Sequence, residues 1–310
     1  MYQRILTPLD GSAYAEAALP VAARIAQASH GTVMLLHVLS SPRELLPYVL
    51  PMMEPSTLTA DVDAASAYLE AASGRADLAE VTTITEVRSG LAGSTILEVA
   101  AHQHADLVVL AAHAHTGLAR WAPGKVAEHV EHDGATPVLS LTDADALPAE
   151  GKPAQGLVLL DGTEEAEAAI APAKHLLEAL SGPEQTNATL RLAWIGAFAP
   201  DAPSHHPADD KDDNVALYLR TVEERLHADA SDKWPFTVTS EVIAEQDLPQ
   251  AVAELATQKQ ATFIALAPHG KRGFPLHISA DFDVHLRGAT TLPLLIVPRN
   301  AAVGETTPEK

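Results

Sequence analysis

The sequence of 310 residues contains no cysteine and few aromatic side chains, and its basic residues are scarce beside its acidic ones. The absence of cysteine excludes disulfide bonds and thiolate chemistry, and it is compatible with a reducing cytosol. Lys and Arg together number 20 against 41 Asp and Glu, which gives a formal net charge of −21. Because a field of that sign repels nucleic acid backbones and anionic lipid, neither is an expected partner.

Long apolar segments are also missing. No apolar run reaches the roughly 20 residues that a membrane-spanning helix needs. Residues 1–4 lead at once into the apolar run 5–9 with no cationic leader before it, so the expected location is the cytoplasm. Hydrophobic residues make up 47% of the chain and aromatic residues 4%. The cores are therefore built mainly from Ala, Val, Leu and Ile, which suits helices packed on a sheet.

An internal repeat is the strongest pattern that the sequence contains, and overlooking it would misassign the fold. Each copy opens with a short apolar run that ends in Asp-Gly followed by a hydroxyl residue, at 10–12 and again at 161–163. Further along, the copies match at a constant shift of 156 positions, which pairs Glu98 with Glu254, His113 with His269, Gly117 with Gly273, His129 with His285 and Pro137 with Pro293. The chain is therefore predicted to be two diverged copies of one unit.

Each copy alternates short apolar runs with amphipathic helices. Residues 94–103 place apolar side chains on one helical face, and the run 107–111 is apolar throughout, as in a strand covered on both faces. This alternation indicates an α/β fold with two doubly wound, mainly parallel five-stranded sheets of Rossmann-like type, one per repeat. We expect a first domain at 1–142, a linker at 143–155, a second domain at 156–299 and a polar tail at 300–310.

The connection after the second strand differs most between the copies. In the first copy, the apolar and proline-punctuated stretch 42–55 is either a loop packed on its own domain or an interface or lid, with Leu45 to Met53 at its centre. In the second copy, the stretch 199–214 contains His205, His206 and four aspartates around Lys211. A solvated surface segment is the favoured interpretation there, and no metal site is predicted.

Candidate binding residues come from one edge of the predicted sheet, because ligands of open parallel sheets bind beyond the carboxyl ends of the strands, where the strand order reverses. In the first copy this edge holds Asp10 after the first strand, Val38 near the end of the second, and His113 in the loop after the fourth. The free N–H groups of a helix N-terminus favour a phosphate. The loop leads into such a start of a helix, at Gly124, Lys125 and Val126.

With these residues, the chain resembles a tandem universal stress protein over nearly its whole length, once per copy. In the nucleotide-binding members of that family, an Asp after the first strand is paired with a later Gly-x2-Gly-x9-Gly-Ser/Thr loop that wraps the phosphates of ATP or ADP. Other members lack the loop and bind no nucleotide. The resemblance implies that Asp10 and Val38 frame the adenosine of a nucleotide, and that the phosphate loop includes His113, Gly124, Lys125 and Val126.

The first copy departs from that loop at three positions. Ala111 and Ala114 stand in place of the first two glycines, and Lys125 replaces the Ser/Thr. A methyl group where the backbone approaches a phosphate costs on the order of 1 kcal/mol, whereas an ammonium at a helix N-terminus can pair with a phosphate. The ATP or ADP pocket of the first copy is therefore predicted to be partly degenerate.

The second copy keeps the first aspartate as Asp161 but has Ala267, Ala280 and Asp281 in its loop. A carboxylate at the phosphate seat repels a phosphate, so this copy is predicted to be silent for nucleotide. Family members commonly dimerise through their last strands, and 137–141 and 293–297 are expected to pair antiparallel within the chain as a pseudo-dimer. Association of two chains as a homodimer stays open.

These observations predict a noncatalytic stress-response protein that binds a nucleotide in its first copy or a protein partner on its surface. The alternatives are an interaction module with two degenerate pockets and, third, a slow ATPase. No Gly-x-Ser-x-Gly elbow is present, and no base or metal-holding carboxylate is evident beside Lys125. No catalytic residue is therefore predicted.

Overall fold

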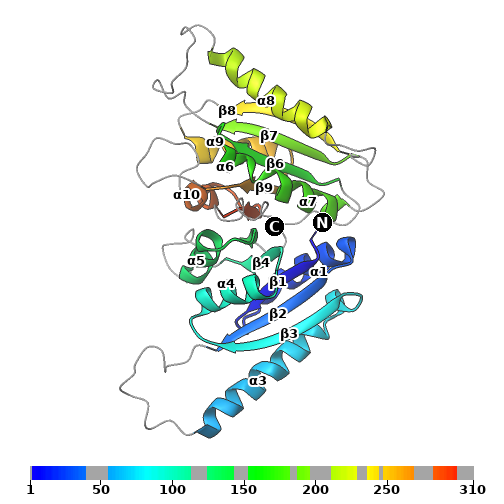
Figure 1. The fold of residues 1–310 in the computed structure, drawn as a ribbon, viewed down its shortest axis with the longest axis vertical. Coiled ribbons are helices and arrows are strands. Elements are labelled where there is room, and N and C mark those ends of the chain that lie inside the picture. The colour runs from blue at the N-terminus through cyan, green and yellow to red at the C-terminus, as the bar shows by residue number, and fades with distance from the viewer. Residues whose placement is uncertain are drawn as a thin grey trace, which may run out of the picture.

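The computed structural model describes residues 2–39, 55–112, 124–142, 153–181, 187–195, 211–228, 236–243, 247–268 and 282–298, with the backbone alone at 55–59 and 211–213. The two halves of the chain lie end to end in an elongated molecule, the first half below and the second above (Figure 1). The stretch 45–53 and His113 lie outside the described residues.

The first half alternates strands and helices. Its elements are β1 (Arg4–Leu9), the 3-10 turn η1 (Ala15–Ala17), α1 (Ala18–Ser29), β2 (Thr32–Leu39), α3 (Pro55–Ser73), the 3-10 turn η3 (Ala76–Leu78), β3 (Thr82–Ser89), α4 (Ala92–His102), β4 (Leu107–Ala111), α5 (Lys125–Asp133) and β5 (Val138–Leu141). The strand at the expected run 107–111 is thus present as β4, and the helix expected at 94–103 is α4.

The second half repeats this order. Its elements are β6 (Gln155–Leu160), α6 (Glu164–Glu167), α7 (Ile170–Ser181), β7 (Thr189–Ile195), α8 (Lys211–Ala228), β8 (Thr237–Ile243), α9 (Leu248–Gln258), β9 (Phe263–Leu266), α10 (Phe282–Ala289) and β10 (Leu294–Ile296). The end of the expected surface segment 199–214 is helical, because α8 begins at Lys211.

The ten strands of the described residues belong to one sheet, in the order β3-β2-β1-β4-β5-β10-β9-β6-β7-β8. Neighbours are parallel within each half, and β5 and β10 pair antiparallel across the middle. The α/β fold and the strand count per repeat are as expected, but the expectation of two sheets is corrected to one. The physical reason is that the last strand of each half would otherwise leave an unpaired edge.

The pairing of β5 with β10 has the symmetry of a two-fold dimer. Leu139 pairs with Leu295, and on either side Val138 pairs with Ile296 and Ser140 with Leu294. Leu139 and Leu295 occupy the same position in the two repeats, 156 residues apart. A pseudo-two-fold axis therefore passes between these two leucines, at the joint between the halves.

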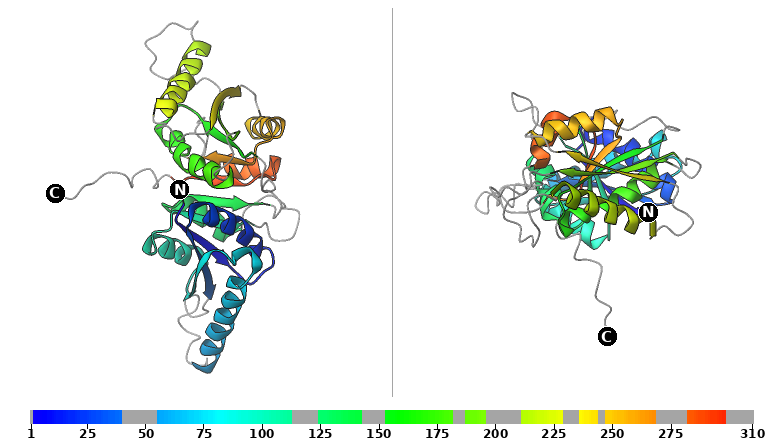
Figure 2. Two further views of the ribbon diagram at one scale, coloured as in Figure 1. Left: turned by 90° about the vertical axis from the view of Figure 1, so that its right-hand side faces the viewer. Right: turned by 90° about the horizontal axis from the view of Figure 1, so that it is seen from above.

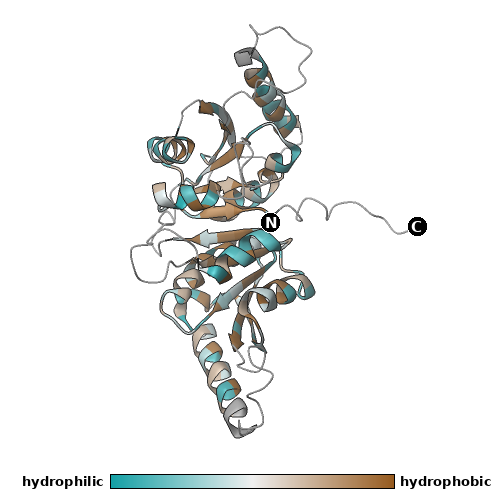
Figure 3. Cartoon of the chain, turned by 90° about the vertical axis from the view of Figure 1, so that its left-hand side faces the viewer, coloured by the Kyte–Doolittle hydropathy of each residue, from teal (hydrophilic) through white to brown (hydrophobic). Residues whose placement is uncertain are grey.

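The inner strands of the first half, β1, β2, β4 and β5, are largely buried on both faces, which explains their continuous apolar runs, whereas the edge strand β3 is partly exposed along its length. Successive residues enter different cores: Ile5 packs in the core that extends through both halves, and Leu6 in a second core of the first half. Val109 and Leu110 of β4 divide in the same way. Helices accordingly cover both faces of the sheet (Figure 2), with the apolar strands between the more polar outer sides of the helices (Figure 3).

Helices α1 and α7 pack against each other beside the joint. The Tyr2 hydroxyl donates a hydrogen bond to the carbonyl of Pro172 over 2.8 Å, and Arg24 donates to the carbonyl of Leu180 over 2.7 Å. The rings of Tyr2 and His175 meet edge to face with centroids 5.9 Å apart. Burial, with the nearby positive charge of the N-terminus and Lys174, lowers the pKa of His175 from its ordinary 6.5 to about 4.

This burial makes the joint sensitive to acid. Because the pKa of His175 is lower in the folded state than in the unfolded state, the unfolded chain binds more protons between pH 6.5 and about 4. We expect stability to fall as the pH falls through that window. In a His175→Phe variant, which keeps an aromatic ring against Tyr2, the loss of Tm between pH 7 and pH 5 should be smaller in calorimetry. An equal loss in both proteins would contradict the assignment.

Candidate functional site

A tight turn follows β1 at the carboxyl edge of the sheet. The backbone N–H of Ser12 donates to Oδ1 of Asp10 over 2.9 Å, and Gly11 between them has a φ of +84°. The Ser12 hydroxyl oxygen then accepts the N–H of Ala15 over 3.1 Å, at the start of η1. The turn holds the Asp10 carboxylate at the surface, beyond the end of β1.

The opposite wall comes from the start of α5. Its N-cap residue, Gly124, has extended backbone and no side chain that caps the helix. Lys125 and Val126 form the first turn, and both side chains are exposed. The N–H groups of this turn and the Lys125 ammonium create a positive end that suits an anionic group. Glu128 in the same turn offsets part of that field.

These two walls enclose a cavity of about 640 Å³, within the usual size range of small-molecule sites. It lies where the strand order reverses between β1 and β4, the expected position for a ligand of such a sheet. Its floor is apolar, with Leu36, Ile96 and Leu110. Polar groups stand at its rim: Asp10, Ser12 and Lys125.

The cavity brings together most of the candidate residues from the sequence. Its lining includes Asp10, Val38, Gly124, Lys125 and Val126, which come from three separate parts of the chain. The sixth candidate, His113, lies outside the described residues. Ala111, which replaces the first glycine of the family loop, also lines the cavity. The roles of these residues in binding stay predictions.

The second half repeats the turn after its first strand. Oδ1 of Asp161 accepts the backbone N–H of Thr163 over 3.2 Å and its hydroxyl over 2.7 Å, and Gly162 has a φ of +87°. The Thr163 hydroxyl oxygen also accepts the N–H of Ala166 and so caps α6. In contrast to Asp10, Asp161 is only 9% exposed.

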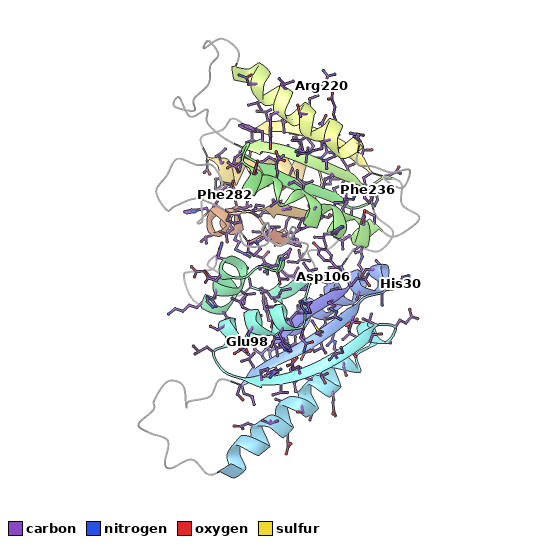
Figure 4. All side chains as sticks on the ribbon, in the orientation of Figure 1. His30, Glu98, Asp106, Arg220, Phe236 and Phe282 are labelled. Carbon is purple, nitrogen blue, oxygen red and sulfur yellow. The ribbon has the colours of Figure 1, made fainter. Side chains whose placement is uncertain are left out.

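The surroundings of this second turn are more closed. A Cβ on Gly162 would lie 2.9 Å from the ring of Trp194, whereas a Cβ on Gly11 would meet no atom within 4 Å. Phe282, labelled in Figure 4 on α10, is 6% exposed. Its counterpart in the first half, Val126, is 43% exposed. Trp194 thus lies against the second turn, and Phe282 is buried where its counterpart in the first half is exposed.

The two glycines offer a matched test of this difference. Replacing Gly11 by Ala should cost about 1–2 kcal/mol of unfolding free energy, because a residue with a Cβ is strained at positive φ. Gly162→Ala should cost more, because the new methyl group also meets Trp194. Urea unfolding of both variants measures the difference, and equal losses would show that Trp194 does not close this turn.

A second repeated feature lies behind the first turn. The Arg75 guanidinium lies 3.1 Å from the Glu16 carboxylate, and the rings of Tyr68 and His37 meet edge to face at 5.7 Å. Burial and the nearby Glu16 carboxylate raise the pKa of Tyr68 to about 12. This arrangement ties α3 to η1 and β2 beside the cavity.

The second half has the same arrangement, with Trp194 in place of the histidine. Tyr218 donates to Oε1 of Glu167 over 2.9 Å, Arg225 pairs with the other oxygen of that carboxylate, and the rings of Trp194 and Tyr218 meet at 5.5 Å. Burial raises the pKa of Tyr218. Sequence reasoning missed this repeat because Glu167, Tyr218 and Arg225 follow their counterparts by 150 or 151 positions and Trp194 follows His37 by 157, not by the 156 of the later elements.

A buried group of polar residues at the joint was also missed. We call it the joint cluster; its members are Glu131, His132, Ser140, Asp283 and Arg287. The Arg287 guanidinium lies 2.8 Å from Oε1 of Glu131 and donates to the hydroxyl oxygen of Ser140 over 2.9 Å. His132 Nε2 lies 3.4 Å from Oδ2 of Asp283. Every side chain except that of His132 is at most 3% exposed.

The joint cluster could in principle hold a cation, because ligand atoms of Glu131, His132 and Asp283 all lie within 4.8 Å of one another. Arg287 already places a positive charge in that space. Burial raises the pKa of Glu131 against the opposing effect of Arg287. Burial lowers the pKa of His132, but the adjacent Asp283 carboxylate outweighs it, and the net shift is upward. The arrangement is an ion-pair network across the joint.

The parallel sheet and the cavity at its carboxyl edge define a Rossmann-like α/β protein. Compared with known families, residues 1–141 match the Universal stress protein family. These residues are therefore a universal stress protein domain. No curated protein sequence matches the chain significantly.

Solved structures match the fold of both halves together. A universal stress protein from Archaeoglobus fulgidus aligns with a TM-score of 0.63 at 16% identity, over 96% of this chain and 98% of that chain. A putative universal stress protein from Pseudomonas aeruginosa aligns with a TM-score of 0.59 at 12% identity, over 96% and 94%. At such identities the likeness concerns the fold alone. In the part of the chain that the structure describes, no helix combines the length and apolarity of a membrane span.

Proposed function

We propose that the chain is a tandem universal stress protein, with domains at 1–142 and 156–299, whose first domain binds ATP or ADP. The observation that carries this proposal is the cavity between Asp10 and the start of α5. It offers an apolar floor for a base and, at its rim, an uncapped helix end beside Lys125 for phosphates.

The second domain is proposed to be silent for nucleotide and to act as a permanent partner of the first. Support comes from its aromatic side chains: Trp194 lies over Gly162, and the buried Phe282 replaces the exposed Val126. In addition, α10 begins at the residue that follows Asp281, and the negative charge of this aspartate would oppose a phosphate.

The proposed role is noncatalytic binding in a stress response. Among the described residues that line the cavity, Asp10 is the one carboxylate, and its Oδ1 accepts the N–H of Ser12. A general base must reach the attacking water and carry a suitable pKa. The lining offers a binding surface and no evident acid–base pair, so slow ATP hydrolysis is the weaker alternative. An interaction module without nucleotide is the other alternative, favoured by Ala111 in the cavity wall.

The test is ligand retention combined with a thermal shift. The purified full chain is denatured and its supernatant is analysed for adenine nucleotide, and Tm is measured with and without millimolar ATP or ADP. A ligand at 100 times its Kd stabilises the folded state by about 2.7 kcal/mol. We expect a clear rise in Tm.

Two matched variants locate the binding site. Asp10→Asn should reduce the rise in Tm, and Asp161→Asn, the same change in the second turn, should leave it unchanged when each variant is compared with its own ligand-free state. No retained nucleotide and no shift with either nucleotide would overturn the proposal and favour the interaction module. If the ligand-induced rise in Tm is lost in Asp161→Asn alone, the nucleotide binds in the second half and the proposed site is wrong.

A further inference from the structure

The joint cluster sits on the pseudo-two-fold axis of the molecule. Glu131 and Arg287 occupy the same position in the two repeats, 156 residues apart, as do the paired Leu139 and Leu295. Residues on a two-fold axis contact their own counterparts. Glu131 therefore meets Arg287 because the halves differ, and in a dimer of two identical halves it would meet another Glu131.

Such self-pairing would place like charges together in a dry site. The side chains of Glu131 and Arg287 are 0% and 3% exposed. Two carboxylates or two guanidinium groups at that distance repel each other strongly where water is excluded. The opposite charges of this chain are thus compatible with one arrangement, the first half against the second.

The hydrogen bond from Arg287 to Ser140 also forms only when a first half pairs with a second half. Ser140 supplies a hydroxyl oxygen 2.9 Å from Nη1 of Arg287. The counterpart of Ser140 in the second repeat is Ile296, which has no acceptor on its side chain. Two second halves would leave both guanidinium groups without this partner.

The contact between His132 and Asp283 likewise needs one residue from each half. Their side chains approach to 3.4 Å across the joint. The counterpart of Asp283 in the first repeat is Ala127, and the counterpart of His132 in the second is Gly288. Each of these two side chains would lose its partner if either half paired with a copy of itself.

We propose that the joint cluster is a recognition device that makes the first half accept a second half and reject another first half. The partner that fits this surface is a half bearing Arg287 and Asp283, and the linked half of the same chain supplies it. A buried ion pair is weak evidence of stability by itself, because replacement by apolar residues is often neutral. Its effect here is to penalise the wrong partner.

A cysteine at the axis reports the wrong pairing directly. The natural chain has no cysteine, so Leu139→Cys introduces the one thiol. In the native joint this residue faces Leu295. When two first halves pair in the same register, it faces its own copy, at a cross-strand distance of about 4.5–5.5 Å between Cα atoms that a disulfide can span.

The full-length reporter is compared in three backgrounds: native charges, Glu131→Gln with Arg287→Gln, and Glu131→Leu with Arg287→Met. Each protein is unfolded in urea, refolded at high concentration and oxidised, and covalent dimers are counted on a non-reducing gel. The variant with both Leu139→Cys and Leu295→Cys should form an intramolecular disulfide and serves as the positive control. Circular dichroism establishes which backgrounds fold.

We expect the ratio of covalent dimer to monomer to rise about tenfold in the neutral backgrounds, equivalent to a change of about 1.4 kcal/mol in pairing preference. The glutamine pair, which keeps polar side chains at both positions, decides the question if the apolar pair fails to fold. The control Leu219→Ala weakens a buried site in α8, which packs on β7 and β8 at the far side of the second half, and should leave the ratio at its native value. Equal ratios in charged and neutral backgrounds, or an equal rise in Leu219→Ala, would overturn the proposal.

Discussion

Replacing Arg287 by methionine should lower the free energy of unfolding by about 3–5 kcal/mol, because removal of one partner leaves a buried charge uncompensated. The guanidinium is 3% exposed and contacts both Glu131 and Ser140. Without it, the Glu131 carboxylate loses the guanidinium that pairs with it in a buried site. Urea unfolding measures the loss, with the slope of the transition checked for two-state behaviour.

Two comparisons isolate the cause of this loss. Arg220→Met removes an arginine whose pair with Glu224 is 3.0 Å long but whose side chain is 75% exposed, so its cost should stay below about 1 kcal/mol. Adding Glu131→Leu to Arg287→Met should recover much of the stability, since the orphaned charge is gone. If the double variant is as unstable as the single one, lost packing rather than charge is the cause.

The loss should also depend on pH. Burial already raises the pKa of Glu131, and the positive charge of Arg287 opposes that rise. Without Arg287 the folded-state pKa lies higher still, so the folded chain takes up this proton before the unfolded chain does as the pH falls. The difference in stability between Arg287→Met and the parent should therefore be greatest near neutral pH and shrink on acidification.

Replacing Lys125 by aspartate should lower nucleotide affinity about 100-fold or more while leaving the fold intact. A charge-assisted hydrogen bond contributes about 1.5–3 kcal/mol, and the substituted carboxylate adds repulsion of about 1–4 kcal/mol at 4 Å from a phosphate near a protein surface. A change of 1.4 kcal/mol corresponds to tenfold in affinity. The substitution also reproduces Asp281, its counterpart in the second half.

Stability and affinity should move in opposite directions in this variant. An acidic residue in the first turn of α5 favours the helix by about 0.3–1 kcal/mol, so the ligand-free Tm should hold or rise slightly. The control Lys125→Arg keeps the charge and should keep most of the affinity. Titration calorimetry with ADP measures the affinity of both variants, and the ligand-free Tm is measured separately by thermal unfolding. An affinity of Lys125→Asp close to that of the parent would show that this side chain does not face the phosphates.

Sequence patterns were sufficient for the parts of the fold that depend on local order. The apolar run that forms β4 and the amphipathic segment that forms α4 are properties of a few neighbouring residues. The antiparallel pairing of the last strands, expected between 137–141 and 293–297, is confirmed by β5 and β10. That pairing joins the two five-stranded sheets into one. The prediction of one sheet per repeat did not take this consequence into account.

The contents of the second site could not be predicted in the same way. Trp194 belongs to β7, and its approach to Gly162 depends on how far β6 and β7 are offset. The contact between Glu131 and Arg287 could have been predicted, because the shift of 156 positions and the pairing of the last strands together place equivalent residues of the two repeats on the pseudo-two-fold axis. That inference needs both facts together, and neither alone indicates it.

The continuous sheet also changes how copies of the protein meet one another in solution. Among the described strands, the outermost in the sheet are β3 and β8, and the helices α3 and α8 lie beyond them at the two ends of the molecule (Figure 1). These two strands carry the exposed apolar side chains of Ile84 and Val242, features that invite edge-to-edge aggregation. Pairing of β5 with β10 inside one chain leaves two outer edges where two unpaired halves would have four, and a net charge of −21 opposes the approach of neighbouring copies. We therefore expect the fused chain to aggregate less readily through its sheet edges than two unpaired halves would, whether or not a ligand is bound.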